Sequence, residues 1–224
     1  MNMTDTTRNR SSDMNGREKI ILVTAFEAFD GETINPTERI LEELPDEAAG
    51  FTIRKLLLPV EFVRASELAV YEYDQLAPAA VMMLGQAGGR SAITPETTGR
   101  NIMNGRIPDN AGFRPEHLPV KESGPAELKS TLPVERIVQA VRKLGIACEK
   151  SDDAGEYVCN TLLYGMLHHV NGAVPAGFIH VPYIREQGHA EAPFMELSDL
   201  RRGILAAIQA VAEEAILQDC VLPE

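Results

Sequence analysis

The 224-residue sequence contains no tryptophan and only three cysteines. Cys148, Cys159 and Cys220 are odd in number and irregularly spaced, a pattern that fits neither a disulfide framework nor a CxxC metal site. We therefore expect free thiols in a reducing compartment.

Basic residues and long apolar runs are also scarce. Lys and Arg number 21 against 33 Asp and Glu, and the formal net charge of −12 argues against electrostatic binding of nucleic acid or of an anionic membrane surface. No apolar run approaches the roughly 18 residues of a membrane span. Residues 1–18 are polar and lack the apolar centre of a secretion signal. We expect a cytoplasmic protein with a disordered N-terminal tail over residues 1–18.

The remaining residues, 19–224, have the composition of one globular domain, because the whole chain is 44% hydrophobic and 24% charged. Asn35 and Pro36 mark a helix start, as N-cap and first helical residue. Strands are expected at 19–26, 51–60, 79–85 and 176–182, and helices from Pro36 and at 61–74, 133–145 and 198–217. This alternation predicts an α/β fold, a three-layer α/β/α sandwich with a mostly parallel, mixed central sheet.

A cysteine and two histidines share the stretch EYVCNTLLYGMLHHV, residues 156–170. Its apolar residues recur at i, i+3 and i+4, which predicts a helix with one buried face. Cys159 and His168 would then be about 14 Å apart along the axis and near opposite faces, and His169 would be about 15 Å away. Neither histidine can share a proton with Cys159, so any base for this thiol must come from elsewhere in the chain.

Cys159 itself falls in the first turn of that helix, where the helix dipole favours the reactive thiolate. A free cysteine is also commonly a small buried apolar residue, and the pattern leaves both interpretations open. His180 lies near the end of the 176–182 strand, on the face that it shares with Phe178. It is either the missing base or a hydrogen-bonded structural histidine.

Residues 85–116 form a long segment rich in Gly, Asn and Pro, and its interspersed isoleucines favour an ordered, functional loop. Glu96 is the only carboxylate between Asp74 and Asp109. It is either the group that orients a catalytic histidine or a solvated loop charge. The glycines of GQAGGR, residues 85–90, would suit a phosphate cradle, but the GK[ST] ending of such a loop is missing.

Six motifs, taken together and in order, resemble one family of cysteine peptidases, pyroglutamyl peptidase type I. The motifs run from about Ile20 to Tyr183 and read ILVTAFEAFDGETINPTE, GQAGGRSAITPE, GRIPDNAG, TLPV, AGEYVCN and AGFIHVPY. The resemblance implies removal of N-terminal pyroglutamate (5-oxoproline) from peptides, without a cofactor or metal. It also implies that the protein forms a homotetramer. The expected binding partners are peptides that carry an N-terminal pyroglutamate.

The resemblance assigns the catalytic roles to Glu96, Cys159 and His180. Cys159 would be the nucleophile, His180 its general base and acid, and Glu96 the group that orients His180.

The resemblance also implies four substrate-binding residues. Phe26 and Phe29, in AFEAFDG, would sandwich the lactam ring, and Gln86 would contact the substrate from the GQAGGR motif. Arg106, in GRIPD, would lie near the oxyanion.

The sequence departs from the family pattern in two loops. The usual GFEPFGG is replaced by AFEAFDG, which introduces Ala25, Ala28 and Asp30, and residues 97–100 read TTGR where RVAI is usual. These changes put substrate range in question more than the triad. The rival hypothesis is therefore a module that binds pyroglutamyl or related peptide N-termini without cleaving them.

Overall fold

The computed structural model of the protein describes residues 18–221. The predicted tail, apart from Glu18, lies outside the described residues. Glu18 is the first residue of strand β1 (Glu18–Phe26), so this strand begins one position earlier than the expected range 19–26.

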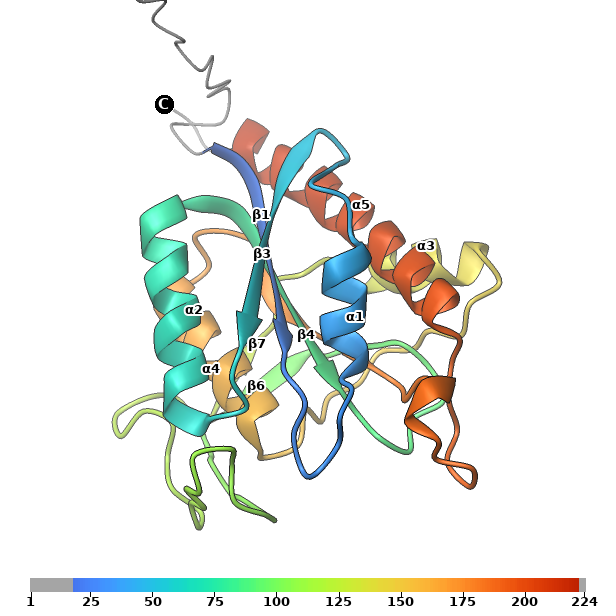
Figure 1. Ribbon diagram of the computed structural model, residues 1–224. Helices are drawn as coiled ribbons and strands as arrows, with labels where there is room; N and C mark the ends of the chain where they lie inside the picture. Colours follow the sequence, from blue (N-terminus) through green and yellow to red (C-terminus); the bar gives the residue numbers. More distant parts are fainter. Residues whose placement is uncertain (1–17, 222–224) are drawn as a thin grey trace, which may run out of the picture.

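A six-stranded sheet forms the centre of the molecule, with strand order β2-β3-β1-β4-β8-β5 (Figure 1). Its strands are β2 (Glu47–Ala48), β3 (Phe51–Leu58), β1, β4 (Pro78–Gln86), β8 (Ala176–Val181) and β5 (Thr94–Pro95). The four inner strands are parallel, whereas β2 and β5 pair antiparallel at the two edges. The predicted mostly parallel, mixed sheet is confirmed.

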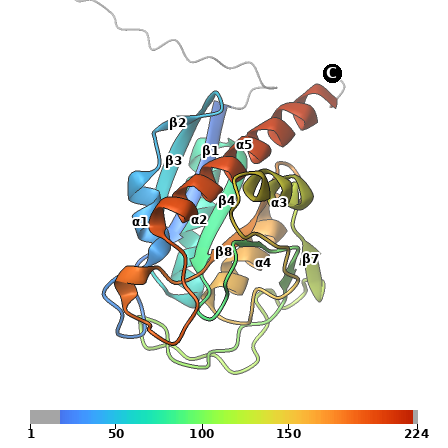
Figure 2. The same cartoon turned by 90° about the vertical axis from the view of Figure 1, so that its right-hand side faces the viewer.

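Helices cover both faces of this sheet (Figures 1 and 2). One face carries α1 (Pro36–Glu43), α3 (Val134–Lys143) and α5 (Leu197–Val221), and the other carries α2 (Phe62–Leu76) and α4 (Val158–Val170). A short 3₁₀ helix, η1 (Arg185–Gln187), and a two-stranded sheet of β6 (Thr98–Arg100) and β7 (Glu127–Lys129) complete the described elements. The predicted α/β/α sandwich is therefore confirmed.

Strand β1 shows why the sequence produces three layers. Its largely apolar run, which includes the buried Thr24, places alternate side chains in the two cores, with Ile21 and Val23 on the side of α1 and α5 and Leu22 and Phe26 on the side of α2 and α4. Side chains of a strand alternate between faces, so a strand covered by helices on both sides is apolar on both faces.

The start of α1 follows the predicted capping pattern. Asn35 is the N-cap, and its Oδ1 accepts a hydrogen bond from Thr37 N at 3.0 Å, with Pro36 at the first helical position. The Thr37 hydroxyl in turn accepts from Phe26 N at 3.1 Å. The cap therefore fixes the chain where β1 ends and the site begins.

Helix α4 differs from the prediction of one buried face. Every residue from Asn160 to Leu167 is buried, because α4 lies between the central sheet, α2 and the β6–β7 pair. Only His168 and His169, near its end, are exposed. The apolar periodicity identified the helix, whereas the small sheet that covers its second face is formed by residues far away in the sequence.

The segment 85–116 is ordered, as predicted. It contributes β5 and β6 and a bridge between Met103 and Leu118. Among the described residues, no helix is long and apolar enough to cross a membrane.

Candidate active site

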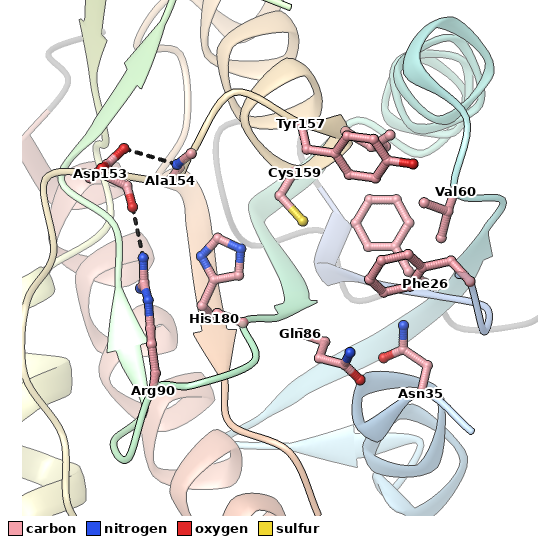
Figure 3. A pocket seen from close by; sticks show the side chains of 14 residues that line it. Phe26, Asn35, Val60, Gln86, Arg90, Asp153, Ala154, Tyr157, Cys159 and His180 are labelled. Carbon is pink, nitrogen blue, oxygen red and sulfur yellow. Dashed lines mark hydrogen bonds between the residues drawn. The ribbon is translucent and has the colours of Figure 1, made fainter. Parts of the chain in front are cut away.

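A pocket of about 280 Å³ lies at the carboxyl ends of β1, β4 and β8 (Figure 3). In parallel α/β sheets this edge is the usual place for ligands, because the loops that follow several strands converge there. Cys159 and His180 both line this pocket, together with residues that follow β1 and residues that precede α4. The structure therefore brings the predicted nucleophile and base to one cavity.

Cys159 is the second residue of α4, and its sulfur packs directly against strand β4. A Cβ atom built on Gly85 would lie 2.9 Å from Cys159 Sγ and 2.5 Å from the ring of Phe178, so only glycine fits there. Gly85 pairs in register with His180. The Cys159 thiol and the His180 imidazole thus lie close together at the carboxyl edge of the sheet, and Figure 3 shows them side by side.

Glu96 reaches His180 through the antiparallel edge strand β5. Thr94 pairs with His180, and Glu96 N donates to Phe178 O at 2.9 Å, so Glu96 lies diagonally across from His180. The distance from His180 Nδ1 to Glu96 Oε1 is 2.7 Å, and Glu96 is fully buried. A carboxylate can only accept, so Nδ1 carries the proton and Nε2 is left on the opposite side of the ring to accept one.

Arg90 is a second partner of Glu96, and sequence reasoning missed it. Arg90 Nη1 donates to Glu96 Oε1 at 2.7 Å, and Arg90 Nη2 donates to Asp153 O at 2.7 Å. The arginine of GQAGGR was visible in the sequence, but its partners depend on the fold. The arginine at the end of the glycine-rich motif therefore binds a carboxylate of the chain itself.

Burial and charge set the protonation states of the site. Burial alone would raise the pKa of Glu96. The hydrogen bond to His180, the Ser151 hydroxyl and the positive charge of Arg90 oppose this and hold the pKa below its usual value of 4.5. Burial lowers the pKa of His180 below 6.5 despite the opposing effect of Glu96. Glu96 is thus a carboxylate and His180 a neutral imidazole at pH 7.

Burial also raises the pKa of the Cys159 thiol to about 12, and the negative charge of Glu96 raises it further while Arg90 opposes the rise. The first-turn position had predicted a stabilised thiolate. The helix dipole contributes at most about 2 kcal/mol, which is less than the cost of burying the thiolate at this position. The resting pair is therefore a thiol and a neutral imidazole.

Aromatic side chains form the wall of the pocket opposite Arg90 (Figure 3). Phe26 is almost completely buried and Phe29 is half-buried, and both line the cavity. The Tyr157 ring, which the sequence analysis did not single out, lies 6.3 Å from the Phe29 ring. Gln86 also lines the pocket, and its Oε1 accepts from Gln187 Nε2 at 2.8 Å.

Arg106 lies outside this pocket. It is exposed and lines an adjoining hollow of about 640 Å³, which shares Phe29, Gln86 and Tyr157 with the Cys159 pocket and also contains Asp30. The structure does not bring Arg106 together with Cys159 as a lining residue of one cavity. Its expected place near the oxyanion stays a prediction.

The other histidines of α4 face a different part of the surface, as predicted. His169 Nε2 lies 2.7 Å from Asp74 Oδ1, and the His168 ring stacks on Tyr164. Cys148 is buried in the core of the opposite face. In the part of the chain that the structure describes, no three His, Cys, Asp or Glu residues are grouped as metal ligands.

Comparison with known proteins gives one consistent result. The family model described as pyroglutamyl peptidase matches residues 19–214. Pyrrolidone-carboxylate peptidase 1 of Caldanaerobacter subterraneus is 40% identical over 198 residues, which cover 86% of this chain and 98% of the relative. The pyrrolidone-carboxylate peptidase of Thermococcus kodakarensis is 42% identical over 198 residues, covering 87% of this chain and 96% of the relative.

Solved structures agree with these sequence relatives. The crystal structure of pyroglutamyl peptidase I from Bacillus amyloliquefaciens matches with a TM-score of 0.84 and 34% identity over 88% of this chain and 98% of that one. A mutant pyrrolidone carboxyl peptidase from Pyrococcus furiosus matches with a TM-score of 0.83 and 36% identity over 87% of this chain and 99% of that one. On this match in sequence and fold, the chain belongs to the pyroglutamyl peptidase family.

Proposed function

We propose that the protein is a cysteine peptidase that removes N-terminal pyroglutamate from peptides through a thioester on Cys159. The observation that carries this proposal is that Cys159 and His180 line one pocket, and that the buried Glu96 lies 2.7 Å from His180 Nδ1. Membership of the family supports the same activity and the same substrate class.

In this mechanism the proton moves as the bond forms. Cys159 Sγ attacks the carbonyl carbon of the pyroglutamyl residue while its proton passes to His180 Nε2. The imidazolium then protonates the leaving amine, which departs as the shortened peptide. Water, deprotonated by His180, hydrolyses the thioester and releases 5-oxoproline and the free thiol. General acid–base assistance of this kind contributes about 10²–10⁴ in rate.

The first turn of α4 supplies the donors for the oxyanion. The first intrahelical hydrogen bond of α4 is from Thr161 N to Tyr157 O, so the N–H groups of Val158, Cys159 and Asn160 have no partner within the helix. Unpaired N–H groups beside the nucleophile are suited to stabilise a tetrahedral oxyanion.

The aromatic wall is suited to the lactam. Phe26, Phe29 and Tyr157 present apolar faces to a flat, neutral ring, and the side-chain amides of Asn35 and Gln86 lie in the same pocket. We assign the pyroglutamyl ring to this side of the pocket.

A binding module without turnover is the rival hypothesis. Incubating the protein with a chromogenic pyroglutamyl amide separates the two, because the peptidase releases the amine with repeated turnover. The rival predicts that a pyroglutamyl ligand binds, for example by calorimetry, while no amine appears.

We also propose that the enzyme is cytoplasmic and homotetrameric. Cys148 and Cys159, the two cysteines whose side chains the structure describes, are free thiols, which suits a reducing compartment. The tetramer is inferred from the resemblance to the family, and sedimentation equilibrium of the purified chain tests it.

A further inference from the structure

Arg90 is the one charged group in direct contact with Glu96 apart from the catalytic histidine, among the described residues. Its Nη1 also contacts the Thr94 hydroxyl at 2.5 Å, in addition to Glu96, and its Nη2 donates to the backbone oxygen of Asp153. The guanidinium is therefore held by three hydrogen bonds to the chain, although its side chain also lines the pocket.

The charge balance of the buried site depends on this contact. The Glu96 side chain has 0% exposure, and burying a carboxylate without a compensating positive charge is strongly unfavourable. His180 is neutral at rest, so it supplies a hydrogen bond but no positive charge. Arg90 is thus the group that compensates the charge of Glu96 before catalysis begins.

The protonation state of Glu96 decides which nitrogen of His180 carries the proton. As a carboxylate, Glu96 accepts from Nδ1–H and leaves Nε2 free to take the thiol proton. A protonated Glu96 would instead donate to Nδ1, and the neutral ring would then carry its proton on Nε2, where it cannot accept one from Cys159.

We propose that Arg90 is a positioning residue for this reaction, because its guanidinium keeps Glu96 a carboxylate and thereby holds the proton of His180 on Nδ1. In this role Arg90 acts through Glu96, to which its Nη1 donates at 2.7 Å. The inference rests on the proposed peptidase activity, and it extends the functional chain to Cys159, His180, Glu96 and Arg90.

Arg100 provides a matched control, because it contacts the same residue, Asp153, as Arg90 does. The carboxylate of Asp153 accepts from Arg100 Nη1 at 3.1 Å and from Gly155 N at 3.0 Å. Arg100 therefore braces the segment that leads into α4, as Arg90 does, but it makes no contact with Glu96. Replacing Arg100 therefore tests the loss of a contact with Asp153 while the positive charge of Arg90 beside Glu96 is kept.

The charged and titratable groups that face Glu96 and His180 are Arg90 from the segment after β4, Asp153 from the segment before α4, and the Cys159 thiol. The Ser151 hydroxyl is a further polar neighbour of Glu96. The positive charge of Arg90 lowers the pKa of both Glu96 and His180, so its removal raises both and should move the acidic limb of the pH profile of kcat/KM to higher pH.

The experiment compares Arg90→Gln, Arg90→Lys and Arg100→Gln by steady-state kinetics on a pyroglutamyl amide across pH. Arg90→Gln should lower kcat by about 10–100-fold, the usual loss for a residue that holds a catalytic group, and shift the acidic limb upward. Arg90→Lys should restore the position of the limb but only part of kcat. Arg100→Gln should keep both within about twofold of wild type, as expected for a surface ion pair.

A double-mutant cycle checks that Arg90 acts through Glu96. In a Glu96→Gln background, Arg90→Gln should cost less than about twofold more, because the two losses share one cause. An unmoved acidic limb in Arg90→Gln, or an undiminished further loss in the Glu96→Gln background, overturns the proposal. If Arg90→Gln alone does not fold, the double variant with Glu96→Gln must fold, because it no longer contains the uncompensated carboxylate. Failure of this double variant to fold contradicts the proposal.

Nuclear magnetic resonance tests the same inference without turnover. Nitrogen-15 shifts of His180, assigned by comparison with His180→Gln, should report Nδ1–H in wild type and in Arg90→Lys, and a larger Nε2–H population in Arg90→Gln. An unchanged tautomer in Arg90→Gln sinks the proposal even if the protein hydrolyses no pyroglutamyl amide, so failure of the proposed function remains distinguishable.

Discussion

Asn160, the residue after the proposed nucleophile, is joined to the backbone of Arg100 by two hydrogen bonds. Its Oδ1 accepts from Arg100 N and its Nδ2 donates to Arg100 O, both at 2.9 Å. Nδ2 also donates to Ile102 O at 2.8 Å, and the side chain is fully buried. Asn160 therefore ties the first turn of α4 to the segment that follows Glu96.

We expect Asn160→Ala to lower the free energy of unfolding by about 3 kcal/mol, because three hydrogen bonds of a fully buried side chain to the backbone of Arg100 and Ile102 are lost. Urea denaturation of the purified variant measures this. Asn101→Ala is the comparator, since Asn101 bonds to the backbone of Lys121 and Gly124 but is half-exposed. Water can replace those bonds, so its loss should be about 1 kcal/mol or less. Equal losses in the two variants would count against the role of Asn160.

Replacing the histidines of α4 should leave turnover nearly intact. His169 pairs with Asp74 on the surface and His168 stacks on Tyr164, so His168→Gln and His169→Gln should change kcat/KM by less than about threefold. His180→Gln should remove activity, because it takes away the base. Matched assays on a pyroglutamyl amide, with circular dichroism to confirm folding, provide the comparison. Loss of turnover in a folded His168→Gln protein would show that the base is misassigned.

Stability should fall on acidification in two windows. Because burial lowers the pKa of His180, the unfolded chain binds a proton below pH 6.5 that the folded chain does not, and stability decreases there. The lowered pKa of Glu96 has the same sign, and its contribution is lost below about pH 4.5 as pH falls through the folded-state pKa.

Thermal unfolding between pH 7 and pH 5 isolates the His180 contribution. His180→Gln should show a smaller drop in Tm over this range than wild type, whereas His169→Gln, at an exposed position, should follow wild type. A His180→Gln protein with the full wild-type drop would mean that His180 does not titrate as its burial requires.

Selectivity for the lactam over its open-chain counterpart follows from the pocket wall. Glutamine at the N-terminus carries an ammonium group, and burying that charge without a partner costs several kcal/mol. Asp153 is the only carboxylate among the residues that line the pocket, and it already binds Arg100 and Gly155 N. We expect pyroglutamyl amides to be cleaved at least about 10³-fold better than glutaminyl amides, which needs about 4 kcal/mol of differential transition-state binding.

Steady-state kcat/KM values on the two matched amides measure this ratio. Asp30→Asn is the control, because Asp30 lines the adjoining hollow and introduces a carboxylate close to the aromatic wall. An unchanged ratio in Asp30→Asn agrees with lactam recognition by the wall. A ratio near one in wild type would refute that recognition, and its increase in Asp30→Asn would identify Asp30 as an amine-binding group.

The elements that the sequence predicted are those whose signal is local. The run 19–26, the Asn35–Pro36 cap and the periodicity of 156–170 each specify one strand or helix through neighbouring residues. They were sufficient to place Cys159 at a helix start and His180 near a strand end.

The contacts that complete the site could not be read in the same way, because they are long-range. Glu96 meets His180 across 84 positions, through a two-residue edge strand with no periodicity of its own. Arg90 meets the Asp153 backbone across 63 positions. The resemblance to the family supplied Glu96 as a candidate, whereas the place of Arg90 required the fold.

The central claim is that Cys159 is the nucleophile, and the most direct test is amine release from a pyroglutamyl amide by wild type, Cys159→Ala and Cys148→Ala at equal concentrations. Cys159 lines the pocket beside His180. Cys148 is buried in the opposite core, and burial raises the pKa of its thiol to about 12. The side chain of Cys220 lies outside the described structure, and we predict that the Cys220→Ala variant also stays active. Wild type and Cys148→Ala should release the amine at similar rates, and Cys159→Ala should fall to the uncatalysed rate. Amine release retained by a folded Cys159→Ala protein would contradict the account.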